Sequence, residues 1–318
     1  MTFADPSPRW VITIDTETYA VNGTLPPFET NIYGLLDGRA FGVQRIIDIC
    51  NEYQAPATFF VDVYMHHHYG AAPVRELCQL IDSQGHDVQL HAHTQWLPGS
   101  TSNRICDFPR AKQASILAEG RDLIDEWIGK PPKAFRAGAY NANMDTIHAL
   151  EATGFALDSS YFAYHRGCPL SAELGNPVTN KPFRIGTILE IPVTCYWLLN
   201  RWRYRKLSKL DVNACSAAEL CSVSPQFVRG DVACVVLFLH SFSFIKWQRN
   251  GRCVPNYRAV ARFEQLLECI RRVDPRSRFV TAAELAADFT PVDGYGADLV
   301  PRLNPACLVP RAFNRLLE

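Results

Sequence analysis

The first strongly apolar segment of the chain reads VITIDTE over residues 11–17. β-Branched residues dominate this segment, and such a composition favours a β-strand. Side chains in a strand alternate between its two faces, so Asp15 and Glu17 project from the same face. Two carboxylates in one small volume repel each other unless a cation or a proton compensates. The pair therefore indicates a metal site or an acid–base site, and two solvated residues at a strand end are the alternative.

Short β-branched or aromatic runs alternate with segments of helical periodicity along the rest of the chain. The expected strands are 11–16, 57–61, 88–93, 134–137, 155–158, 188–193, 232–240 and 279–281, and helices are expected over 41–53, 74–83, 111–128 and 144–153. This alternation is typical of βα units around a largely parallel sheet. No Gly-x-Gly-x-x-Gly follows the first strand, which disfavours a dinucleotide-binding sheet. We predict a distorted, closed (β/α) barrel with about seven parallel strands.

Length and composition narrow the class of protein. We expect the 318 residues to form a single catalytic domain, with a long loop or small insertion over 161–186, where Pro, Gly and Asn are frequent. Lysine plus arginine equals aspartate plus glutamate, at 32 each, so no net charge favours nucleic acid. The apolar runs are too short for a transmembrane helix. The start lacks the features of a secretory signal, so we expect a cytoplasmic protein with mostly reduced cysteines.

A second polar pair lies in the segment GHDVQLHAH over residues 85–93. Polar and apolar residues alternate there, so His91 and His93 share one face of a strand. Two imidazoles and one carboxylate form a ligand set that suits zinc and leaves a position for water. A hydrogen-bonded core histidine is the alternative for either residue.

Charged residues also end three further strands. His240 follows the apolar run 232–239, and catalytic side chains of parallel barrels collect where strands end, so it is a candidate general acid. Arg136 and Asp158 could each orient a catalytic partner or simply form ion pairs at the rim. The consecutive histidines 66–68 are expected to form a loop, because adjacent positions of a regular element do not converge on one ion. The run 201–206 alternates cations with aromatics and could bind phosphate or a membrane surface, although a solvated face is the simpler interpretation.

Taken together and in order, these motifs resemble the polysaccharide deacetylase, or NodB-homology, family. The resemblance extends from residue 11 to about residue 283 and includes TIDTE at 13–17, ATFFV at 57–61, GHDVQLH at 85–91, FRAG at 135–138, LEIPV at 189–193 and LHS at 239–241. It implies a distorted barrel, a divalent metal and hydrolysis of an acyl group on a sugar. By position it implies the following roles: Asp15 as general base, Arg136 as the residue that holds it, Glu17 and His91 as metal ligands, His240 as acid, and Asp158 as the residue that tunes His240.

The chain departs from the commonest family pattern at two positions. Thr16 separates two carboxylates that are usually adjacent, and Gln95 stands where the second histidine ligand usually lies. Because Asp-x-Glu and His-x-His each keep their pair on one strand face, His93 can replace the missing ligand.

We therefore predict a metal-dependent hydrolase that removes an acetyl or formyl group from the nitrogen of an amino sugar or glycan precursor, with zinc as the expected metal. An amidase acting on a linear or cyclic amide that is not a sugar is one alternative. A catalytically silent barrel that binds glycans is the other.

Overall fold

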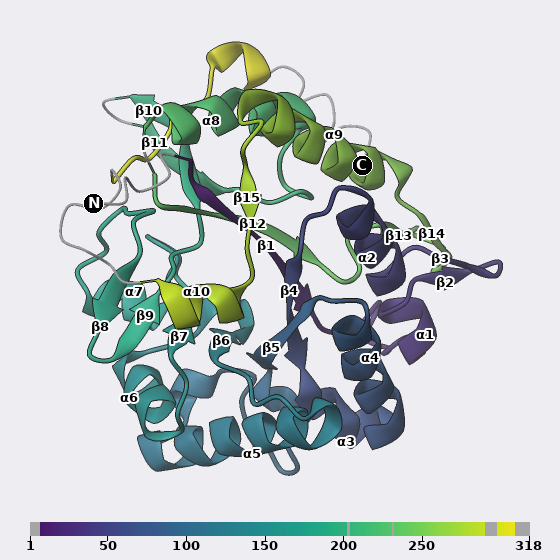
Figure 1. The fold of residues 1–318 in the computed structure, drawn as a ribbon. Coiled ribbons are helices and arrows are strands. Elements are labelled where there is room, and N and C mark those ends of the chain that lie inside the picture. Colours follow the sequence, from purple (N-terminus) through teal and green to yellow (C-terminus); the bar gives the residue numbers. More distant parts are fainter. Residues whose placement is uncertain (1–6, 202–203, 231, 290–297, 309–318) are drawn as a thin grey trace.

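The computed structural model describes residues 7–201, 204–230, 232–289 and 298–308. One sheet organises this part of the chain, with strands in the order β12-β1-β4-β5-β6-β7-β9-β8 and β15 paired with β1 (Figure 1). Its strands are β1 (Arg9–Thr16), β4 (Ala57–Asp62), β5 (Asp87–Ala92), β6 (Ala134–Ala137), β7 (Leu157–Asp158), β8 (Phe183–Ile185), β9 (Ile188–Glu190), β12 (Cys234–His240) and β15 (Arg278–Phe279). All of its pairings are parallel except that of β8 with β9.

The predicted distorted barrel with about seven parallel strands is confirmed, with one difference. Seven parallel strands run from β12 to β9, but within the described residues no ladder joins β8 to β12. The sheet is thus curled into a half-barrel and does not close. Three two-stranded hairpins lie outside it: β2 (Leu35–Leu36) with β3 (Arg39–Ala40), β10 (Cys195–Arg201) with β11 (Tyr204–Lys209), and β13 (Ile245–Trp247) with β14 (Cys253–Pro255).

Helices connect and cover the strands (Figure 1). Their bounds are α1 (Phe28–Asn31), α2 (Val43–Glu52), α3 (His66–Tyr69), α4 (Ala71–Ser83), α5 (Arg110–Ile128), α6 (Met144–Ala152), α7 (Pro169–Glu173), α8 (Ala217–Arg229), α9 (Tyr257–Val273) and α10 (Ala282–Asp288). The four helices predicted from periodicity are therefore present as α2, α4, α5 and α6. In the described part of the chain, no helix is long and apolar enough to span a bilayer.

Alternation along β1 sorts its side chains between two apolar cores. Ile12 and Ile14 belong to the large core that includes residues of the helices, whereas Val11 belongs to a smaller core that also contains Val236 of β12. Helix α10 contacts β5 and β6 and contributes Leu285 to this smaller core. Because Asp15 has the same parity as Val11, its side chain is directed to the side of the sheet that holds the smaller core.

The segment 161–186, predicted as a long loop or a small insertion, contains regular structure. It contains α7 and the strand β8, which pairs antiparallel with β9. The hydroxyl of Tyr161 donates a hydrogen bond to the carbonyl oxygen of Pro177 at 2.7 Å. This bond ties the start of the segment to the stretch that follows α7. The eleven cysteines are all free, and seven of them are buried, as expected for reduced core residues.

Candidate active site

The register of the parallel strands brings the predicted site residues to one edge of the sheet. Asp15 on β1 lies opposite His240 on β12, and His91 on β5 lies opposite Arg136 on β6. All four residues lie at or near the carboxyl ends of their strands. In barrels of parallel strands, this is the end at which catalytic side chains gather.

Asp15 is held by a buried guanidinium. Arg136 has no solvent exposure, and its Nη1 donates to Asp15 Oδ1 at 2.7 Å and to Thr13 Oγ1 at 3.0 Å. Its Nε and Nη2 donate to the carbonyl oxygen and the hydroxyl of Ser159 at 3.1 and 2.9 Å. The ring of Phe60 lies 4.4 Å from the guanidinium carbon. Arg136 thus fixes the orientation of the Asp15 carboxylate and compensates its charge.

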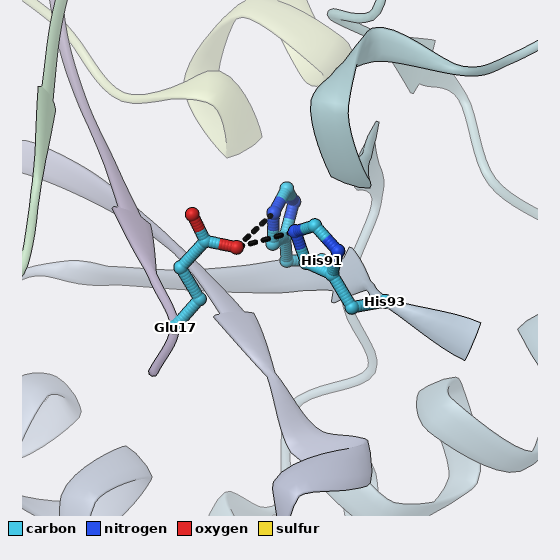
Figure 2. A group of neighbouring side chains, drawn as sticks. All are labelled: Glu17, His91 and His93. Atoms are coloured by element: carbon cyan, nitrogen blue, oxygen red, sulfur yellow. Dashed lines mark ion pairs between the residues drawn. The ribbon is translucent and has the colours of Figure 1, made fainter. Parts of the chain in front are cut away.

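Glu17, His91 and His93 converge on one small volume (Figure 2). Their ligand atoms all lie within 4.8 Å of one another. Glu17 Oε2 lies 3.5 Å from His91 Nε2 and forms a closer ion pair with His93 Nε2. Gln95, at the usual family position of the second histidine, is exposed. The structure therefore places His93, and not Gln95, beside His91.

Outer hydrogen bonds orient both imidazoles. His91 Nδ1 lies 2.8 Å from the carbonyl oxygen of Arg136, and His93 Nδ1 lies 3.0 Å from Asn103 Oδ1. Both partners accept, so each Nδ1 carries a proton and each Nε2 is directed toward Glu17. Metal-bound histidines in proteins are typically held in this way. The donor set, two imidazole nitrogens and a carboxylate, fits a divalent metal such as zinc.

Electrostatics couple these groups strongly. Burial favours the neutral form of Glu17, but the charges and hydrogen bonds of His93 and His91 outweigh burial and hold the pKa of Glu17 well below its usual value. Burial likewise opposes the charge of His93, yet Glu17 raises the pKa of His93 to about 10. Without a metal, His93 is therefore protonated at neutral pH and forms an ion pair with Glu17. A metal ion would take the place of that proton.

Asp62 is a buried carboxyl group that the sequence analysis did not single out. It is the last residue of β4, lies opposite His91 in the sheet and has no solvent exposure. Burial raises the pKa of Asp62 to about 7, even though the charges of His93 and His91 lower it. The signal that could have revealed it is its position, directly after the apolar run 57–61.

His240 lies on the other side of Glu17. Its Nε2 is 3.6 Å from Glu17 Oε1, and its ring stacks on that of Phe242 at 4.7 Å. Burial lowers the pKa of His240, and the charges of Glu17, Asp15 and Asp211 oppose this effect. A histidine beside Glu17 and Asp15 can donate and accept protons at this edge of the sheet.

The structure corrects the role that the resemblance implied for Asp158. Asp158 Oδ1 accepts a hydrogen bond from Ser160 Oγ at 2.6 Å, and its carboxyl group lies beside that of Glu190 on β9. The next residue, Ser159, contacts Arg136 instead. Because side chains alternate along the strand, Asp158 is directed away from the side that holds Asp15 and His240.

Asp211 is a third acidic residue, after Glu17 and Asp15, whose charge reaches His240. Its backbone forms a bridge with Phe238 of β12, two residues before His240, and its carboxylate pairs with Lys209 Nζ at 3.1 Å. No sequence motif pointed to this residue, since it lies just after the β10–β11 hairpin with no chemical pattern around it.

Tyr140 borders the site at the end of β6. Ala139 and Tyr140 have φ angles of 49° and 60°, in the left-handed region that residues other than glycine seldom adopt. Burial and then the charge of Asp15 raise the pKa of Tyr140. The Tyr140 hydroxyl accepts a hydrogen bond from Lys209 Nζ at 3.2 Å. Strained backbone of this kind is frequent at functional sites.

The prediction that the histidines at 66–68 form a loop and do not converge was wrong. They form the short helix α3, and His66, His67 and Glu119 of α5 place ligand atoms within 4.8 Å of one another. Residues 66 and 67 can approach one point because their rings lie against each other, with centroids 3.9 Å apart. Glu119 then completes a group that lies outside the Glu17 site.

Comparisons with known proteins agree with this architecture. A family model described as polysaccharide deacetylase matches residues 36–157, a segment that includes His91 and Arg136 but neither β1 nor β12. No curated protein matches the chain. A "putative polysaccharide deacetylase" from Mycobacterium smegmatis is similar in structure, with a TM-score of 0.56, 19% identity and coverage of 90% of this chain and 92% of that one. Puue allantoinase is also similar, with a TM-score of 0.51, 13% identity and coverage of 90% and 91%. Residues 36–157 therefore match the polysaccharide deacetylase family model, and the described chain is similar in fold to the structure of the "putative polysaccharide deacetylase".

Proposed function

We propose that this chain is a metal-dependent hydrolase that removes an N-acyl group, acetyl or formyl, from an amino sugar or glycan precursor. One observation carries the proposal: the ligand atoms of Glu17, His91 and His93 converge beside the buried ion pair of Asp15 and Arg136. The family match over residues 36–157 supports deacetylase activity. The cytoplasmic location expected from the sequence stays a prediction.

Glu17, His91 and His93 would hold the metal, with zinc as the proposed ion. When bound, a divalent metal polarises the acyl carbonyl and lowers the pKa of a coordinated water toward ~7. The protein supplies the outer hydrogen bonds from Arg136 and Asn103 that fix the two imidazoles.

Proton transfer falls to two residues on neighbouring strands. Asp15, held by Arg136, accepts the proton of the attacking water, and His240 donates a proton to the leaving amine. Asp211 stabilises the protonated form of His240 electrostatically. We assign stabilisation of the developing oxyanion to the backbone amide near Tyr140.

The test combines metal content with hydrolysis of N-acetyl and N-formyl amino sugars. In Asp15→Asn, turnover should fall about a hundredfold or more while metal stays bound, as is usual when a general base is lost. His91→Gln should lose both metal and activity. His67→Gln serves as the matched control, because it removes a ligand of the second histidine group. Full activity in Asp15→Asn would refute the assignment of the base.

The same assay separates the two alternatives. Hydrolysis of imides or ureides in the absence of sugar hydrolysis would indicate an amidase of non-sugar compounds. Glycan binding without metal and without any hydrolysis would indicate a silent barrel.

A further inference from the structure

A cavity of about 590 Å³ lies beside the candidate active site. Its walls come from two segments far apart in the sequence, the stretch after β7 and the β10–β11 hairpin. The side chains that matter here are Phe162, Tyr164, His165, Trp197, Arg205 and Lys206. Residues 202 and 203 of the run 201–206 lie outside the described residues, whereas Arg205 and Lys206 of this run are exposed to solvent and also line the cavity.

The cavity shares a wall with the site through Tyr140. The Tyr140 ring lies 5.4 Å from that of Phe162 and 5.6 Å from that of His165, and both of these rings line the cavity. On its other side, the Tyr140 hydroxyl accepts a hydrogen bond from Lys209, which also forms an ion pair with Asp211. A molecule in this cavity would therefore lie next to the residues that surround Asp15 and His240.

Among the described residues, the lining combines cations with rings and contains no carboxylate. Arg205 and Lys206 are exposed, and neither forms an ion pair with any residue that the structure describes. Uncompensated cations at the mouth of an aromatic cavity attract an anionic ligand, and guanidinium matches phosphate and carboxylate in geometry. Aromatic walls with a few placed polar groups are typical of small-molecule sites.

We propose that this cavity binds an anionic group of the substrate, a phosphate or a carboxylate, while the aromatic side chains contact the adjoining sugar. The proposal rests on the proposed function, because it assigns the substrate class to the same site. The substrate is then a negatively charged N-acylated amino sugar and not a neutral glycan.

Calorimetric binding to the full-length, zinc-loaded Asp15→Asn variant tests this without turnover. The probes are N-acetylglucosamine, which is neutral, N-acetylglucosamine 1-phosphate, which carries a phosphate, and N-acetylmuramic acid, which carries a carboxylate. We expect at least one anionic probe to bind about tenfold or more tightly than the neutral one, with a preference that weakens as salt is added. The probe that binds more tightly than N-acetylglucosamine shows whether the cavity prefers phosphate or carboxylate.

The double substitution Arg205→Gln and Lys206→Gln should abolish that preference. The matched control, Arg110→Gln with Lys112→Gln, removes the same charge from exposed positions of α5 and should retain the preference. Equal affinity for all three probes would overturn the proposal, and so would a preference that survives in the Arg205/Lys206 variant, since the anion would then bind elsewhere. If the wild-type protein hydrolyses none of the probes, the proposed function fails, whereas the binding result still decides the cavity.

Discussion

Replacing Arg136 by methionine is the sharpest test of how the site is built. Arg136 is fully buried and donates four hydrogen bonds, to Asp15, Thr13 and both acceptors of Ser159. Methionine fills much of the same volume but donates none of these bonds. The substitution would leave the Asp15 carboxylate buried, 5% exposed and without its cation.

Removing one partner of a buried ion pair costs about 3–5 kcal/mol in the free energy of unfolding, and we expect Arg136→Met to fall in this range. Asp15→Asn alone leaves the buried guanidinium of Arg136 without its counter-charge, so this substitution should also destabilise the fold. In the Asp15→Asn background, the Arg136→Met step leaves no unpaired charge, so its cost should drop to about 1–2 kcal/mol. The difference between the two costs, about 2–3 kcal/mol, is the coupling between the two side chains.

Urea unfolding of the four proteins, followed by tryptophan fluorescence with a metal chelator present, measures these free energies. The chelator is needed because bound metal would itself stabilise the folded state. A cost below about 1 kcal/mol for Arg136→Met would refute the structural role given to this residue. A coupling energy near zero would show that Arg136 stabilises the fold without acting through Asp15.

Three further substitutions test the structure away from the reacting groups. Burial and then the charge of Asp158 raise the pKa of Glu190, so this residue should make the wild type less stable as pH rises above about 4.5. Glu190→Gln should therefore unfold at a higher urea concentration than the wild type at pH 8, but not at pH 4. Burial lowers the pKa of His86, so the stability that the neutral imidazole contributes is present above about pH 6.5 and is lost as pH falls. His86→Gln should therefore show a smaller decrease in the free energy of unfolding from pH 7.5 to 5 than the wild type. Gly120→Ala would favour helix α5 by about 1 kcal/mol on propensity alone, yet the new Cβ would lie 2.5 Å from the Tyr64 hydroxyl. We therefore expect a net loss of about 1–3 kcal/mol by thermal unfolding, and an unchanged or higher melting temperature would contradict the packing described.

Much of the site could be predicted from the sequence because strands obey a fixed period. Asp15 and Glu17 share a face for the same reason as His91 and His93, and parallel strands bring their carboxyl ends to one edge. This period allowed His93 to lie beside His91, whereas Gln95, which has the same parity, lies beyond the end of β5 and is exposed.

The period fails where a strand is very short. β7 contains only two residues, Leu157 and Asp158, so the pattern could not show which of its neighbours points inward. A shift of one residue reverses the face, and the structure directs Ser159 to Arg136 and Asp158 to Glu190.

By itself, the sequence determined the strand–helix alternation, the (β/α) barrel class and the strand-borne residues that meet at the sheet edge, but not that the sheet stays open. Only the tertiary structure decided which distant segments meet. Asp211 reaches His240 because a hairpin packs against β12, Glu119 meets His66 because α5 packs beside α3, and the cavity forms because the segment after β7 lies against β10 and β11. Such contacts depend on packing between elements far apart in the chain, and no local periodicity encodes them.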